Sequence, residues 1–148
     1  DRFGSIIALS GAFMRDRVLE AVESHSPHKK RYYERFFGDI DTVLGSEKDY
    51  AAMAERFRED PDLPKPNFYV ACGAHDSLCQ CNRDFVELLR SCNLDVTYWE
   101  PDIGAHEWPF WNAWIDCALD WFAPGEMKPS TAPVDYSALT SLRFPQKQ

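Results

Sequence analysis

Short apolar runs alternate with helical patterns along most of this chain. Residues 5–9, 68–72 and 96–99 are rich in β-branched and aromatic side chains, and turn residues bound each run, which predicts three buried strands. Two helices are expected after the second and third runs, because apolar side chains recur there at helical spacing. The first would carry on one face Phe85, Leu88, Leu89 and Cys92. The second would carry Trp111, Trp114, Ile115, Ala118, Leu119 and Phe122, with Pro109 in its first turn.

The stretch between the first two strands reads as a broken helical region. Met14, Val18 and Val22 recur every fourth residue. Ser46 followed by Asp49 is a variant of the capping box, and it predicts the start of another helix. Three prolines within residues 60–66 then end that helix. We therefore expect a helical, cap-like insertion at 14–66.

Strands that alternate with helices predict an α/β fold with a parallel sheet covered on both faces. We expect one partial domain over residues 1–124. Proline, serine, threonine and lysine dominate residues 125–148, which predicts a flexible tail.

Composition and charge narrow the class of protein. The 148 residues carry a formal net charge of −8, which disfavours nucleic acid and anionic membranes as partners. No apolar run approaches the roughly 20 residues that cross a bilayer, and no signal-peptide pattern is present. Five cysteines are an odd number, so we expect mostly reduced thiols and a cytoplasmic location.

Two candidate catalytic side chains follow neighbouring predicted strands. Ligands of open α/β sheets gather at the carboxyl ends of the strands, where Asp76 follows the second strand and His106 follows the third. A carboxylate that orients an imidazole is the acid–base half of a catalytic triad, and the order acid before histidine is that of α/β-hydrolases. The alternative is structural: Asp76 as a helix N-cap and His106 packed on Trp108.

Four blocks of sequence strengthen the catalytic interpretation, namely 1–12 (DRFGSIIALSGA), 36–39 (FFGD), 71–76 (ACGAHD) and 104–111 (GAHEWPFW). In this order they resemble the esterase family of α/β-hydrolases that includes tributyrin-type acetyl esterases and S-formylglutathione hydrolases. The resemblance implies a cofactor-free serine esterase that cleaves small-molecule esters with short acyl groups through an acyl-enzyme. It assigns Asp76 as the triad acid and His106 as the base. His75 departs from the family, which often has an acidic residue at that position.

The nucleophile is the larger departure from the family. No Gly-x-Ser-x-Gly elbow occurs in the sequence, and in the family this elbow precedes the segment that 1–12 resembles. The resemblance therefore implies a carboxyl-terminal portion of the fold, with the nucleophile and oxyanion-hole donors on an upstream segment. Ser10 is the rival nucleophile, because it follows a strand and has small residues on both sides.

Three other hypotheses remain open at this stage. A catalytically silent module could associate through an exposed sheet edge, either as a homo-oligomer or with a complementary amino-terminal segment. Four closely spaced residues of types that bind metals could hold zinc: Cys72, His75, Cys79 and Cys81. Alternatively, Cys72 or Cys79 could act as a nucleophile. Aromatic residues of the insertion could shape an acyl pocket or pack in the core: Tyr32, Tyr33, Phe36 and Phe37.

Overall fold

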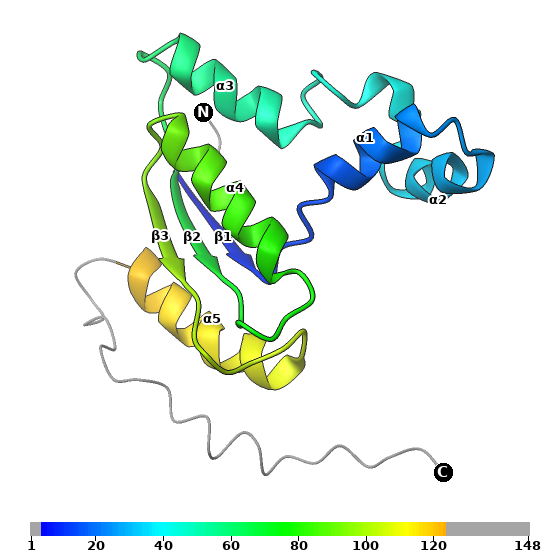
Figure 1. Ribbon diagram of the computed structural model, residues 1–148. Helices are drawn as coiled ribbons and strands as arrows, with labels where there is room; N and C mark the ends of the chain where they lie inside the picture. The colour runs from blue at the N-terminus through cyan, green and yellow to red at the C-terminus, as the bar shows by residue number, and fades with distance from the viewer. Residues whose placement is uncertain (1–3, 124–148) are drawn as a thin grey trace, which may run out of the picture.

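A three-stranded parallel sheet organises the computed structural model, which describes residues 4–123 (Figure 1). The strands are β1 (Ser5–Leu9), β2 (Asn67–Ala71) and β3 (Val96–Trp99), and they lie in the order β1-β2-β3. Leu9 pairs with Ala71, and Ala71 pairs with Trp99, so all three strands end at the same edge. The parallel sheet expected from the sequence is therefore confirmed, and its carboxyl edge is where the candidate side chains must meet.

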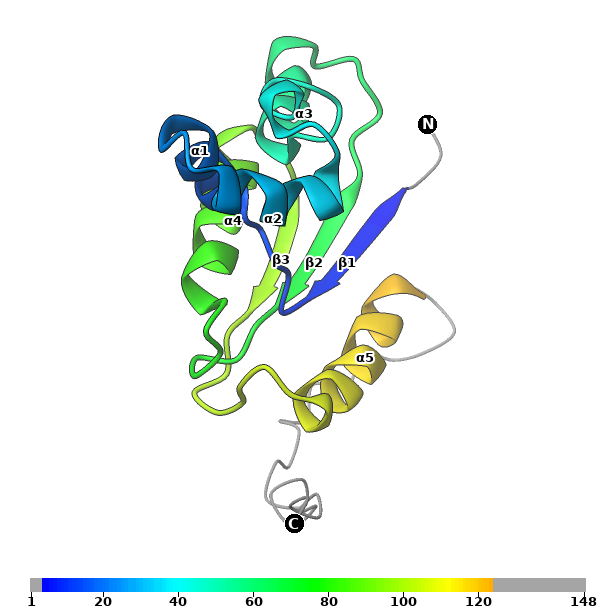
Figure 2. The ribbon, with the colours of Figure 1, turned by 90° about the vertical axis from the view of Figure 1, so that its right-hand side faces the viewer.

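Helices cover both faces of the sheet, as Figure 2 shows for α4 (Cys79–Ser91) and α5 (Trp108–Phe122). The alternation of side chains along β2 divides the core between these helices. Even-numbered residues of β2 face α4, within a cluster that contains Phe68, Val70, Phe85, Val86 and Leu89. Odd-numbered residues face α5, within a cluster that contains Tyr69, Ala71, Phe110, Trp114 and Ala118. Burial on both faces explains why β2 is an almost continuous apolar run.

The insertion between β1 and β2 is helical, as expected. It contains α1 (Arg15–Glu23), α2 (Pro27–Phe37), the 3₁₀ helix η1 (Ile40–Thr42) and α3 (Tyr50–Glu59). The first three surround a small core of their own, formed by Val18, Ala21, Ile40 and Val43. Helix α3 instead adds Ala54 to the core beneath α4. Figure 1 accordingly shows α1 and α2 standing to one side of the sheet.

The start of α3 differs from the sequence expectation in its capping residue. Asp49, and not Ser46, is the N-cap, and its carboxylate accepts a hydrogen bond from the Ala51 amide at 3.0 Å. The Ser46 hydroxyl donates to the Val43 carbonyl, within the preceding turn. The buried Asp49 carboxylate also accepts from Arg15 Nε at 2.9 Å, which joins α3 to α1. Asp49 is the cap because it directly precedes Tyr50, the first residue of α3, whereas Ser46 belongs to the turn before it.

The apolar face of α5 is narrower than the sequence pattern suggested. Trp114 and Ala118 are buried, but Ile115, Leu119 and Phe122 are exposed. The reason is that α5 lies on one face of a three-stranded sheet, mainly against β1 and β2 and through Trp121 against Thr97 of β3, so that the sheet covers only part of the stripe.

Two further expectations concern the membrane and the tail. Within residues 4–123, no helix combines the length and the hydropathy that spanning a bilayer requires. The predicted flexible tail, 125–148, lies outside the described residues.

Candidate active site

The loops that follow β2 and β3 press against each other at the carboxyl edge of the sheet. The Ala74 amide donates to the Pro101 carbonyl at 3.0 Å, and the His75 amide donates to the Gly104 carbonyl at 3.2 Å. A Cβ atom on Gly73 would lie 2.2 Å from the Gly104 oxygen, so only glycine permits this approach. Gly104 itself has φ +103°, a left-handed conformation that side chains disfavour.

This contact between the loops brings Asp76 and His106 together. The Asp76 amide donates to the Gly73 carbonyl at 3.0 Å, which turns the chain back toward the sheet. One carboxylate oxygen of Asp76 accepts from the Leu78 amide at 2.8 Å. The other lies 3.1 Å from His106 Nδ1. The predicted acid and base therefore lie within hydrogen-bond distance of each other.

Asp76 also fulfils part of its alternative structural role. Leu78 is the N-cap residue of α4, and its amide is the one that binds the Asp76 carboxylate. The same side chain thus anchors the start of α4 with one oxygen and holds His106 with the other.

The two side chains differ in their exposure to solvent. The Asp76 side chain is fully buried, whereas that of His106 is 48% exposed. The imidazole meets Trp111 edge to face, with ring centroids 4.9 Å apart, and not Trp108 as the structural alternative proposed. Because Nδ1 is turned toward Asp76, Nε2 is the nitrogen left for a reacting group. Nδ1–H donation to a buried carboxylate is the arrangement that selects this tautomer.

Asp76 is held as a carboxylate despite its burial. Burial alone would raise the pKa of Asp76, but interactions with the Leu78 amide, the Ser10 hydroxyl and His106 outweigh it. The pKa of Asp76 is consequently lowered from its ordinary value. An ionised acid is what stabilises an imidazolium during catalysis.

Ser10 does not occupy the position of a nucleophile. It is buried at the end of β1, and its hydroxyl lies near Asp76 and Cys72. Among the described residues, no hydrogen bond joins this hydroxyl to His106. A serine beside the acid cannot give its proton to the base, so this geometry does not support the rival nucleophile.

The zinc hypothesis is wrong for the described part of the chain. Within residues 4–123, no three histidine, cysteine or acidic side chains are placed to hold a metal ion. His75 is exposed, whereas Cys72 is buried just after β2.

The thiols are also poor candidates for a nucleophile. Burial raises the pKa of Cys72 to about 12 and raises that of Cys79 as well. Both side chains are therefore neutral thiols near pH 7, whereas the reactive form of cysteine is the thiolate.

An ion pair beside the loops that carry Asp76 and His106 had no signal in the sequence. Arg83 of α4 binds Glu100 through both Nε, at 2.8 Å, and Nη2, at 2.5 Å. The Tyr98 hydroxyl donates to the same carboxylate at 2.7 Å. The Arg83 guanidinium is the main reason that the pKa of Glu100 falls to about 2. This pair joins the end of β3 to α4. The loop with His106 follows β3, and the loop with Asp76 precedes α4.

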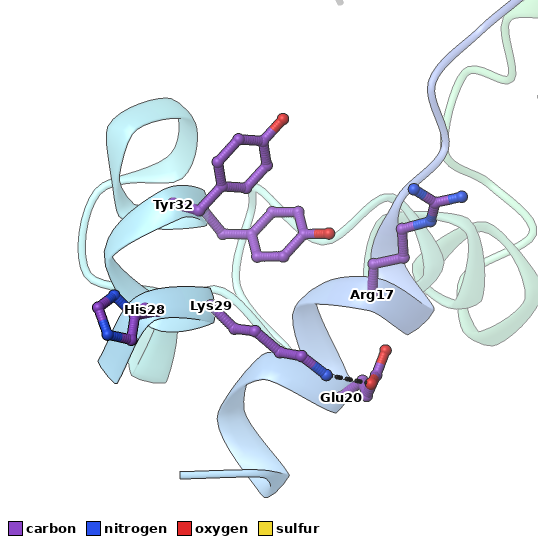
Figure 3. Close-up of a pocket in the computed structure, with 6 residues that line it drawn as sticks. Arg17, Glu20, His28, Lys29 and Tyr32 are labelled. Carbon is purple, nitrogen blue, oxygen red and sulfur yellow. Dashed lines mark hydrogen bonds and ion pairs between the residues drawn. The ribbon is translucent and has the colours of Figure 1, made fainter. Parts of the chain in front are cut away.

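The insertion carries a separate open hollow between α1 and α2 (Figure 3), with a volume of about 430 Å³. Lys29 and Glu20 form an ion pair across it. Its full lining is Arg17, Glu20, His28, Lys29, Tyr32 and Tyr33. Two of the predicted acyl-pocket residues thus line a hollow that contains neither Asp76 nor His106.

Comparison with known proteins identifies two informative relatives. The chain is 36% identical over 124 residues to an acetyl esterase from Caldicellulosiruptor saccharolyticus, covering 82% of this chain and 46% of that protein. The structure resembles a crystal structure of S-formylglutathione hydrolase from Staphylococcus aureus, with a TM-score of 0.60 and 25% identity. That match covers 82% of this chain and 45% of the hydrolase.

A ferulic acid esterase gives a weaker match, with a TM-score of 0.43 and 18% identity over 78% of this chain and 49% of that one. No family model matches the sequence. The esterase resemblance and the α/β-hydrolase fold are nevertheless confirmed by the first two relatives. The chain spans less than half the length of either of them.

Proposed function

We propose, from the premise that this chain is a homologue of esterases with the α/β-hydrolase fold, that it supplies the acid and base of a serine esterase. The substrates would be small molecules with short acyl groups in ester linkage. Asp76 is the acid and His106 the base, while the nucleophilic serine belongs to a segment outside this sequence. The observation that carries the proposal is the 3.1 Å contact between Asp76 Oδ2 and His106 Nδ1 at the carboxyl edge of the sheet.

The mechanism follows from the two ring nitrogens of His106. As the serine oxygen attacks the ester carbonyl carbon, Nε2 takes the hydroxyl proton. The resulting imidazolium then protonates the departing alcohol oxygen, and an acyl-enzyme remains. Water repeats the sequence in the second half: Nε2 takes its proton, the oxygen attacks the acyl carbon, and serine leaves with the proton. Throughout, Asp76 accepts the Nδ1–H and stabilises the positive charge on the imidazolium.

Burial and charge at the site support these roles. The buried carboxylate of Asp76 is shielded from water, which strengthens its electrostatic effect on the imidazolium. The half-exposed imidazole of His106 is accessible to a nucleophile approaching from outside the described part of the chain. Neither role calls for a cofactor, and the net charge of −8 disfavours nucleic acid and membranes as partners.

A second candidate function has its own supporting observation. β1 is an edge strand among those described, and it offers Ile6, which is 40% exposed. Leu119 and Phe122 of α5 are also exposed. A parallel edge of this kind favours pairing with another chain. The chain would then act as an association module, through a complementary segment or a second copy.

Ester hydrolysis by the longer protein that includes the nucleophile segment tests the enzymatic proposal. With p-nitrophenyl acetate as substrate, we expect His106→Ala to lower kcat by about 10³-fold or more, because the general base is lost. The matched control is His75→Ala, which removes the exposed histidine of the neighbouring loop and should leave the rate unchanged. Full activity in His106→Ala would overturn the proposal.

A further inference from the structure

Ser10 occupies an unusual backbone position directly beside the candidate acid. Its φ angle is +51°, in the left-handed region that residues other than glycine rarely adopt. Its amide donates to the Ala71 carbonyl at 2.8 Å, which extends the pairing of β1 with β2 by one residue. Backbone strain of this kind persists only where the surroundings impose it.

Asn82 is the residue that fixes this turn. Its amide nitrogen donates to the Gly11 carbonyl at 2.8 Å, and its oxygen accepts from the Gly11 amide at 3.1 Å. Asn82 is fully buried in α4, so both hydrogen bonds are shielded from water. The end of β1 is therefore clamped to the helix that begins just after Asp76.

The Ser10 hydroxyl has no other evident role in the described structure. Its oxygen is buried and makes no hydrogen bond of standard geometry there, a state that costs free energy unless an acceptor is nearby. The ionisable groups around Asp76 include His106, which donates to it, and three thiols that burial keeps neutral: Cys72, Cys79 and Cys81. The Ser10 hydroxyl lies beside Asp76 and Cys72, and of these two only Asp76 is charged.

We propose that Ser10 is a positioning residue that donates a third hydrogen bond to the buried Asp76 carboxylate, in addition to those from Leu78 and His106. The hydroxyl hydrogen rotates to suit its acceptor, and a bond to a carboxylate is stronger than one to a neutral group. The effect of the hydroxyl on the pKa of Asp76 agrees with this role. The inference rests on the proposed function, since it treats Asp76 as the acid that orients His106.

Titration of Asp76 by carbon NMR of its carboxyl group, on the 148-residue chain, tests this inference. The variant is Ser10→Gly, because glycine accepts the positive φ and the change removes the hydroxyl without strain. We expect the pKa of Asp76 to rise by about one pH unit, because the carboxylate loses a hydrogen bond that stabilises its charged form. The control is Ser46→Ala, whose hydroxyl donates to the Val43 carbonyl, and it should leave the pKa of Asp76 unchanged.

Two further variants separate the possible outcomes. If Ser10→Gly does not fold, Ser10→Cys retains the size of the side chain, and its weaker donor should still raise the pKa of Asp76. His106→Gln should raise that pKa independently, because the imidazole is one of the groups that lower it. An unchanged pKa in a folded Ser10 variant, with a raised one in His106→Gln, overturns the role of Ser10 alone. An unchanged pKa in His106→Gln counts against the acid–base pair itself.

Discussion

At the scale of single residues, the candidate site depends on two glycines as much as on the acid and the base. Gly73 lets the loop after β2 lie directly on the loop after β3. Gly104 supplies the left-handed turn that this second loop needs before it reaches His106. Asp76 and His106 face each other because the backbones of the two loops are in contact.

Gly73→Ala should therefore destabilise the fold and separate the pair. The added Cβ would lie 2.2 Å from the Gly104 backbone oxygen, which no side-chain rotation can relieve. We expect a loss of about 1–3 kcal/mol in the free energy of unfolding, measured by urea denaturation. Gly4→Ala is the control, since nothing lies within 4 Å of a Cβ at that position. Equal stability of the two variants would show that the loops do not need this close contact.

The acid–base pair could be predicted from the sequence, whereas its surroundings could not. Parallel strands end at a common edge, so residues that follow consecutive strands are brought near each other by topology alone. The location of Ser10 beside Asp76 depends on a left-handed turn and on Asn82 binding Gly11, 71 residues apart in sequence. No local pattern encodes such a pairing, and for this reason Ser10 was open to interpretation as a nucleophile.

At the scale of the elements, the ion pair between Arg83 and Glu100 fixes β3 relative to α4. The bidentate geometry restrains both direction and distance, and Tyr98 adds a third donor from β3 itself. The loops that carry Asp76 and His106 each extend from one of these two elements. The ion pair is thus expected to stabilise the frame on which the site is built.

The contribution of Glu100 to stability should depend on pH with a definite sign. Its pKa in the folded state, about 2, lies below the ordinary 4.5, so its stabilising effect is full above about pH 4.5 and is lost as the pH falls toward 2. We expect Glu100→Gln to lower the free energy of unfolding by about 1 kcal/mol at pH 7 and by progressively less in acid. Glu87→Gln, on the exposed face of α4, is the control. A difference that stays constant from pH 7 to pH 2 would contradict this assignment.

The limits of two of the strands follow from sequence, but the packing of α5 does not. Residues 5–9 and 96–99 are strands as expected, because their β-branched and aromatic runs end at turn residues. The helical stripe of α5 was expected to be buried as a whole. How much of a stripe is buried depends on how the helix lies across the strands, and within the described residues α5 packs mainly on β1 and β2, while Trp121 reaches Thr97 of β3.

At the scale of the whole molecule, an apolar surface extends along α5, where Ile115, Leu119 and Phe122 are all more than a third exposed. The chain spans less than half the length of the esterase relatives. Exposed apolar area of this kind favours association in water.

The isolated chain should therefore self-associate through α5. We expect Leu119→Lys to shift the chain toward the monomer in analytical ultracentrifugation while the unfolding temperature changes little, because this side chain is 46% exposed. Leu63→Lys is the control, since Leu63 is also exposed but lies in the segment between α3 and β2. A chain that is already monomeric at high concentration would show that this surface does not drive association.

The measurement that tests the central claim most directly is fluorophosphonate labelling of a protein in which this chain is joined to the proposed nucleophile segment. A serine activated by His106 attacks phosphorus, fluoride leaves, and the serine proton passes to Nε2. Mass spectrometry of the digested protein then locates the modified residue. We predict a single labelled serine outside the 148 residues of this sequence, and loss of labelling in His106→Ala. Labelling of Ser10, or labelling that is unaffected in His106→Ala, would contradict the claim that Asp76 and His106 serve a nucleophile on another segment.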